Sequence, residues 1–192
     1  KYWTLPGYAW DAMLKMTGVE LELLTDIDQY QFMENGIRGG VSMIAHRHAK
    51  ANNKYIEQHN SNIKYDENKP TSYITYVDAN NLYGSAMSSS LPYKNFEWVE
   101  KPEELNINEL NKVEDVGYIL EVDLEYPQKL HDLHNDLPVA PENLTITNNM
   151  LSDWQKQIKQ TLNINTPNKN NKLVPNLMNK NKYVLHYKNL IY

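Results

Sequence analysis

The sequence predicts an α+β fold with a mostly antiparallel sheet, several helices and long connectors. Three observations carry this prediction. Short segments rich in β-branched and aromatic residues predict strands, other segments have helical spacing, and stretches rich in Asn and Lys predict connectors. With 192 residues and 22.5 kDa, the chain is long enough for one ordinary domain or a piece of a larger one.

The helices are predicted from spacing and end signals, in the first half of the chain. The second helix ends at Gly36, a residue type that often follows a helix, and the pair Gly39 and Gly40 marks a loop or tight turn. The segment after residue 100 is acidic and weakly helical up to Asp115. We expect helices at residues 10–17, 26–35, 41–53 and 82–88.

The strands are predicted from composition and from alternation. Residues 73–77 are aromatic or β-branched throughout, and residues 117–126 alternate between apolar and acidic side chains, as in a half-buried strand. Polar or proline-rich composition predicts connectors at 58–70 and 163–181 and irregular structure at 127–142. We expect strands at residues 73–77, 96–99, 117–126 and 182–192.

Composition excludes several classes of protein. The chain has no Cys, so it has neither a disulfide framework nor a thiolate metal site, and its mean hydropathy is −0.69. No apolar run is long enough for a membrane helix, and no signal sequence precedes the first helix, so we expect an intracellular protein of unknown compartment without a membrane partner. The chain begins at Lys1, and we expect it to be a piece of a longer protein.

Charge differs strongly between regions. Residues 97–153 hold 14 acidic and 3 basic side chains, whereas residues 154–192 hold 7 Lys and no acid. Upstream, residues 35–56 carry Arg38, Arg47, Lys50 and Lys54 with no carboxylate. Basic segments with interleaved Tyr, Asn and His suit a phosphate backbone, and the alternative is ordinary solvated surface charge.

A carboxylate stands at the junction between the predicted strand 73–77 and the predicted helix 82–88. Asp78 follows the strand directly, a position at which a sheet would fix a carboxylate beside the N–H groups of a helix. Such a junction suits a hard cation and a phosphate. The alternative is that Asp78 only caps the helix or bonds its own turn.

The residues at this junction resemble a known motif. Residues 76–87, Tyr-Val-Asp-Ala-Asn-Asn-Leu-Tyr-Gly-Ser-Ala-Met, are similar to the first palm motif of family B DNA polymerases, Asp-x-x-Ser-Leu-Tyr-Pro after a hydrophobic strand. The likeness is to the protein-primed branch of viruses, linear plasmids and self-synthesising transposons. Upstream, Ile37-Arg38-Gly39-Gly40 resembles the Tyr-x-Gly-Gly motif between the exonuclease and polymerase domains of that branch. The resemblance covers residues 1–145 well and the tail loosely.

The resemblance implies a role for each matched residue. Asp78 would be the catalytic carboxylate that helps hold two Mg²⁺ ions, with Mn²⁺ as a substitute, and the carbonyl of Ala79 would bind the metal on the nucleotide phosphates. Tyr83 would pack under the sugar of the incoming deoxynucleotide and exclude a 2′-hydroxyl; the alternative is a core aromatic. The remaining nucleotide-binding residues implied are Asn80, Asn81 and Leu82.

The DNA partners follow from the same resemblance. Gly39 and Gly40 would let the backbone approach template phosphates, and basic side chains would add charge. The implied partners are the DNA template and primer, dNTP and a terminal priming protein. The implied DNA-binding residues are Arg38, Gly39, Gly40, Arg47 and Lys50.

The sequence departs from the family pattern in named places. Asn81 replaces Ser, Gly84 replaces Pro and Ile37 replaces Tyr, and neither the second nor the third palm motif is found. One Asp cannot balance two divalent ions and a triphosphate, so we expect this chain alone not to polymerise. The expected organisation is an exonuclease-like end at 1–36, linker motif and connector at 37–70, a palm portion with an acidic insertion at 71–145, and a connector with a further palm or insertion segment at 146–192.

Two other functions are compatible with the residues. The chain is a non-catalytic remnant that binds nucleic acid through its basic segments, or it is a metal-dependent hydrolase. Asp123, flanked by acids on one strand face, is a candidate second carboxylate, although an exposed charged face explains the alternation as well. The hydrolase would bind Zn²⁺ or Mn²⁺ through His131, His134 and Asp136.

Overall fold

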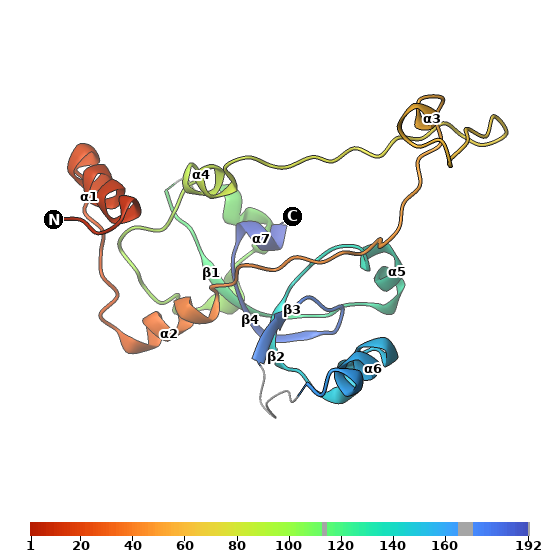
Figure 1. The fold of residues 1–192 in the computed structure, drawn as a ribbon. Helices are drawn as coiled ribbons and strands as arrows, with labels where there is room; N and C mark the ends of the chain where they lie inside the picture. The colour runs from red at the N-terminus through yellow and green to blue at the C-terminus, as the bar shows by residue number, and fades with distance from the viewer. Residues whose placement is uncertain (113–114, 165–170, 192) are drawn as a thin grey trace. The chain divides into compact units, whose positions relative to one another are not determined.

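The computed structural model describes residues 1–112, 115–164 and 171–191 (Figure 1). Helices and small sheets occur together, and the β2–β3 pair is antiparallel, which confirms the α+β class. The helices are α1 (Leu5–Thr17), α2 (Ile27–Asn35), α3 (Ile56–His59), α4 (Leu82–Met87), α5 (His131–His134), α6 (Asp153–Thr161) and α7 (Lys188–Ile191). The strands are β1 (Ile119–Leu124), β2 (Glu142–Thr145), β3 (Asn171–Val174) and β4 (Lys180–His186).

The chain divides into two compact units, each built from separate stretches of sequence. The first unit contains residues 1–37, 81–123 and 181–192, and the second contains residues 38–80 and 124–180. Each unit is described by itself. In the part of the chain that the structure describes, β1 pairs with β4 and β2 pairs with β3, giving two small sheets.

The first two helices begin and end where local signals place them. Thr4 caps α1 by accepting a hydrogen bond from the backbone N–H of Gly7 at 3.4 Å, and Gly18 ends the helix in the left-handed conformation, with φ of 65°. Asp26 caps α2 by accepting from the N–H of Asp28 at 2.8 Å. Both predicted helices are confirmed, and α1 begins earlier than expected because Pro6 suits the first turn.

The apolar core of the first unit forms around β4. Val184 is only 1% exposed, and the backbone of Gly36 approaches it so closely that an added Cβ would lie 3.1 Å from Val184 Cγ1. The other buried apolar side chains among the described residues are Leu110, Tyr183, Leu185 and Tyr187. The tail therefore contributes most of this core. The predicted strands at 117–126 and 182–192 are confirmed in part, as β1 and as β4, which begins at Lys180 and ends at His186. Residues 188–191 differ from the prediction, because they form the short helix α7.

The predicted strand at residues 96–99 is wrong. The segment lies against α2 through side chains instead of pairing with another strand. Gln29 Nε2 donates to the carbonyl oxygen of Phe96 at 3.2 Å, and the rings of Phe32 and Trp98 meet edge to face with centroids 5.3 Å apart. Because a side chain of α2 satisfies a backbone carbonyl here, the segment stays extended without joining a sheet.

The second unit contains the β2–β3 pair and a buried cation beside it. Glu142 faces Val174 and Thr145 faces Asn171 in the antiparallel register. Lys180, 1% exposed, donates to Glu142 Oε2 at 2.8 Å and also contacts the carbonyl and amide oxygens of Asn176. A buried ammonium needs such partners because an unpaired charge away from water is very costly.

The predicted connector at 58–70 belongs to a closed loop, residues 52–72, organised by one side chain. Asn52 pairs with Ser72 through their backbones, and the Asn52 amide donates to the carbonyl oxygens of Asp66, Lys69 and Pro70 at 3.0–3.2 Å. Asn52 Oδ1 accepts from the N–H of Asp66 at 3.0 Å. The connector is therefore an ordered loop whose polar side chains hold its backbone together.

The segments on either side of this loop correct two further predictions. Residues 41–53 form no helix, because apolar side chains such as Ile44, 77% exposed, have no surface to pack against. Residues 73–77 form no strand. A strand needs a neighbouring strand to pair with its backbone groups, and in the part of the chain that the structure describes no strand pairs with this segment. Tyr76 is 94% exposed. Two other predictions of irregular structure are also wrong in part, since α5 lies within residues 127–142 and β3 within 163–181.

Candidate metal and nucleotide site

The predicted catalytic carboxylate lies on an exposed, irregular stretch of chain. Asp78 and its neighbours Ala79 and Asn80 are exposed. They are the last residues of the stretch 38–80 of the second unit, and Asn81 begins the stretch 81–123 of the first unit. Asp78 is accessible to a cation from solvent. It does not cap α4, so the capping role considered for it from the sequence is wrong.

The cap of α4 is Asn81. This residue adopts the left-handed conformation, with φ of 57° and ψ of 47°, and its Oδ1 accepts from the N–H of Gly84 at 3.1 Å. Asn tolerates this conformation better than most residues with a side chain. A Cβ added at Gly84 would lie 2.3 Å from the Asn81 amide nitrogen, so the glycine gives this cap its space.

Two apolar side chains on the first turn of α4 face solvent. Leu82 is 65% exposed and Tyr83 is 86% exposed, so Tyr83 is not a core aromatic, contrary to the alternative considered from the sequence. The predicted helix at 82–88 is confirmed as Leu82–Met87. The sequence contains a signal for this cap, because Asn is a preferred capping residue and Asn81 stands three positions before Gly84.

The predicted DNA-binding segment is an irregular chain with basic side chains in solvent. Gly40 has a φ of 73°, which favours glycine, and nothing lies within 4 Å of an added Cβ at either Gly39 or Gly40. Arg47 and Lys50 are exposed, and Arg38 is half-buried. The backbone at the two glycines is therefore open to close approach by a ligand.

Acidic side chains of the second unit lie beside this basic segment. His46 Nε2 donates to Asp136 Oδ2 at 2.8 Å, and the positive charge of Arg38 acts on Glu142. Burial opposes ionisation of Glu142, but hydrogen bonds from Lys180 and Asn176 and the nearby positive charges outweigh it and leave the pKa of the carboxyl below its usual value. The segment thus has anionic neighbours within its own unit.

The candidate second carboxylate has a structural partner. Asp123 Oδ1 accepts from the backbone N–H of Lys182 at 2.8 Å. Lys182 has a φ of 51°, inside β4, so the carboxylate supports a local irregularity of the strand. The contact explains an acid at this position without a metal.

Each of the three candidate hydrolase ligands has a hydrogen-bond partner within the chain. His131 Nε2 bonds the carbonyl oxygen of Tyr126 at 3.3 Å, His134 Nδ1 bonds the hydroxyl of the same tyrosine, and Asp136 bonds His46. The ring of Tyr126 lies edge to face with both imidazoles. Among residues 1–112, 115–164 and 171–191, no three His, Asp or Glu side chains are grouped as a metal site.

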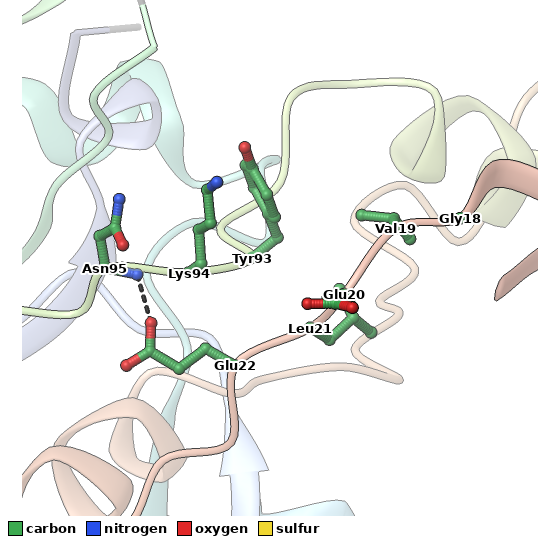
Figure 2. A pocket seen from close by; sticks show the side chains of 8 residues that line it. All are labelled: Gly18, Val19, Glu20, Leu21, Glu22, Tyr93, Lys94 and Asn95. Carbon is green, nitrogen blue, oxygen red and sulfur yellow. Dashed lines mark hydrogen bonds between the residues drawn. The ribbon is translucent and has the colours of Figure 1, made fainter.

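A groove in the first unit lies between the segment after α1 and residues 93–95 (Figure 2). The backbone N–H of Glu22 donates to the carbonyl oxygen of Tyr93 at 2.9 Å, and the Glu22 carboxylate accepts from the N–H of Asn95, as the dashed line in Figure 2 shows. The groove carries charges of both signs, on Glu20, Glu22 and Lys94. None of the residues predicted to bind metal, nucleotide or DNA lines it.

Comparison with known proteins adds no family. No protein-family model, curated protein or solved structure matches the chain. Within the described ranges, no helix is both long enough and apolar enough to cross a membrane.

Proposed function

We propose that the chain is the palm-entry portion of a protein-primed family B DNA polymerase, which adds deoxynucleotides to a primer by two-metal phosphoryl transfer. The observation that carries the proposal is the motif at residues 76–87, in which an exposed Asp78 is followed by a short helix capped at Asn81. The open backbone at Gly39 and Gly40 upstream is a second support.

The residues present fit part of a magnesium site. The Asp78 carboxylate and the Ala79 carbonyl are hard oxygen ligands of the kind that Mg²⁺ takes. These two ligands are too few for two ions. The remaining ligands would be the nucleotide phosphates, water and a second palm carboxylate that these residues do not supply. The chemistry that the bound ions supply is stabilisation of the attacking 3′ oxygen and the leaving pyrophosphate.

The chain's own residues have the remaining roles. Asp78 would supply negative charge that holds the ions, and Tyr83, exposed on α4, would offer a flat apolar surface to the sugar of the incoming nucleotide. Asn81 would have two roles. Its Oδ1 accepts the hydrogen bond that caps α4, and its amide N–H groups would donate to phosphate oxygens of the nucleotide. Arg38, Arg47 and Lys50 would neutralise template phosphates.

The proposal also offers a reason for the unpaired segment before Asp78. Residues 73–77 have strand composition, and Tyr76 and Val77 are 94% and 80% exposed. In a palm this segment would lie in a sheet beside the turn of the third motif, which would supply the second carboxylate. Because that motif is not found in this chain, we expect the chain by itself not to polymerise.

Primer extension tests the proposal. The protein is the chain joined to the remaining palm motifs, assayed with Mg²⁺, dNTPs and a primed template. Asp78→Asn is expected to lower the rate about a thousandfold, because loss of a metal ligand removes several kcal/mol of transition-state stabilisation. Asp132→Asn, a change of an exposed acid on α5, is the matched control and is expected to leave the rate unchanged.

A second candidate function is nucleic-acid binding without catalysis. It is favoured by the exposed basic segment around Arg47 and makes no demand on Asp78. Extension that is equal in the wild type and in Asp78→Asn would refute the metal-binding role of Asp78, on which the polymerase proposal depends. Absence of extension in both, with DNA binding retained, would favour the non-catalytic function instead.

A further inference from the structure

The contact between His46 and Asp136 joins two parts of the second unit that are 90 residues apart in sequence. Nε2 of the imidazole lies 2.8 Å from Oδ2 of the carboxylate, and the two side chains are 76% and 48% exposed. An ionised carboxylate only accepts hydrogen bonds, so the imidazole is the donor. His46 thus presents an N–H to an anionic oxygen at the surface of the molecule.

This contact lies in the middle of the basic segment. His46 stands directly before Arg47 and four residues before Lys50, and both of these side chains are exposed. The oxygen that His46 binds is chemically similar to a phosphate oxygen, since both are anionic acceptors with similar hydrogen-bond geometry. The upstream end of the same segment also lies near an acid, because the charge of Arg38 acts on Glu142.

We propose that His46 is a further phosphate-contacting residue of the nucleic-acid surface, and that Asp136 is its internal competitor. In the absence of nucleic acid, the carboxylate occupies the imidazole N–H. When a DNA backbone lies along the basic segment, a phosphate oxygen replaces Asp136 Oδ2. The inference rests on the proposed function only in taking DNA as the partner, and it makes no use of Asp78.

The exchange predicts a definite sign for each variant. Removing the charge of Asp136 frees His46 for phosphate, so Asp136→Asn is expected to bind DNA more tightly. An exposed pair of this kind changes an equilibrium by up to about fivefold. His46→Ala is expected to bind less tightly than the wild type. In that background Asp136→Asn has no donor to release, so its effect is expected to disappear.

The experiment is fluorescence anisotropy of a labelled primer–template duplex, titrated with the whole chain at fixed salt. The proteins are the wild type, His46→Ala, Asp136→Asn, the double variant and the control Asp132→Asn, which changes an exposed acid of α5 four residues before Asp136. We expect Asp136→Asn to tighten binding about threefold. The double variant should match His46→Ala, and Asp132→Asn should match the wild type.

Several outcomes would overturn the inference. Tightening by Asp136→Asn that persists in the His46→Ala background, or equal tightening by Asp132→Asn, would show a general charge effect instead of an exchange. Weaker binding by Asp136→Asn, or no DNA binding by the wild type, would also refute it. Failure of the polymerase proposal can be distinguished from failure of this inference. Equal primer extension by the wild type and Asp78→Asn would leave the anisotropy result, and this inference, unchanged.

Discussion

Replacing Asn52 by alanine is expected to open the loop of residues 52–72 while the rest of the second unit stays folded. The Asn52 side chain donates to three backbone carbonyls and accepts from one backbone N–H. Its amide has only two hydrogens, so one of them is shared between two of those carbonyls. The side chain thus provides about three full hydrogen bonds, each with a net value of about 1 kcal/mol, and its loss destabilises the closed loop by about 3 kcal/mol.

Hydrogen exchange of the backbone amides measures this opening directly. The N–H of Asp66 donates to Asn52 Oδ1, so its exchange reports the closed loop. A change of about 3 kcal/mol in local opening corresponds to exchange about a hundredfold faster. Asn60→Ala is the matched control, because Asn60 Oδ1 accepts only the nearby N–H of Asn62, at 3.1 Å. We expect its effect on the Asp66 amide to be less than about threefold.

One result would refute this reasoning. If the Asp66 amide exchanged at the same rate in Asn52→Ala and in the wild type, the loop would be held by something other than the Asn52 side chain. Asn53 is the next side chain to test, because it is 7% exposed and its amide donates to the carbonyl oxygen of Ser72 at 3.0 Å. If the Asp66 amide exchanged faster in Asn53→Ala but not in Asn52→Ala, Asn53 would be the side chain that holds the loop closed.

Two further predictions concern the cap of α4 and the buried ion pair. Gly84→Ala places a Cβ against the Asn81 amide, so we expect the loss of a cap that contributes about 1 kcal/mol. Hydrogen exchange of the Ser85 amide, which donates to the Asn81 carbonyl, should then be about fivefold faster. Gly39→Ala is the control expected to have no effect, because nothing lies close to a Cβ added there. The pKa of Glu142 lies below its ordinary value of 4.5 in the folded chain, so its stabilising effect is present above that pH and is lost as the pH falls through the folded pKa. Urea denaturation should show Glu142→Gln less stable at neutral pH and less sensitive to acid, the two curves converging at low pH; parallel curves would contradict the role of the pair.

The parts of the fold that could be predicted from sequence depend on neighbouring residues. The helix α2 follows from Asp26 and Gly36 at its two ends, and the strand β1 follows from alternation along a single segment. The class of the fold followed from such local patterns. The start of α1 was missed because Thr4 and Pro6 mark it before the apolar spacing begins.

The parts that could not be predicted depend on residues far apart in sequence. Residues 73–77 have the composition of a strand, but composition cannot say whether a partner strand is present. The loop 52–72 closes through contacts from Asn52 to residues 14 to 18 positions away, and β2 needs its partner β3 across an intervening helix. At the candidate site, the residue type of Asn81 is a signal for a helix cap, but the left-handed conformation in which it caps α4 is a property of the folded turn and could not be predicted.

The contact between Asn81 and Gly84 has a consequence for how this motif can vary. A proline at position 84 has no N–H, so it could not donate to Asn81 Oδ1, and any side chain at that position would crowd the Asn81 amide. Among sequences that share this turn, we expect proline to be absent from position 84, since it would remove the N–H that the cap uses and would crowd the Asn81 side chain.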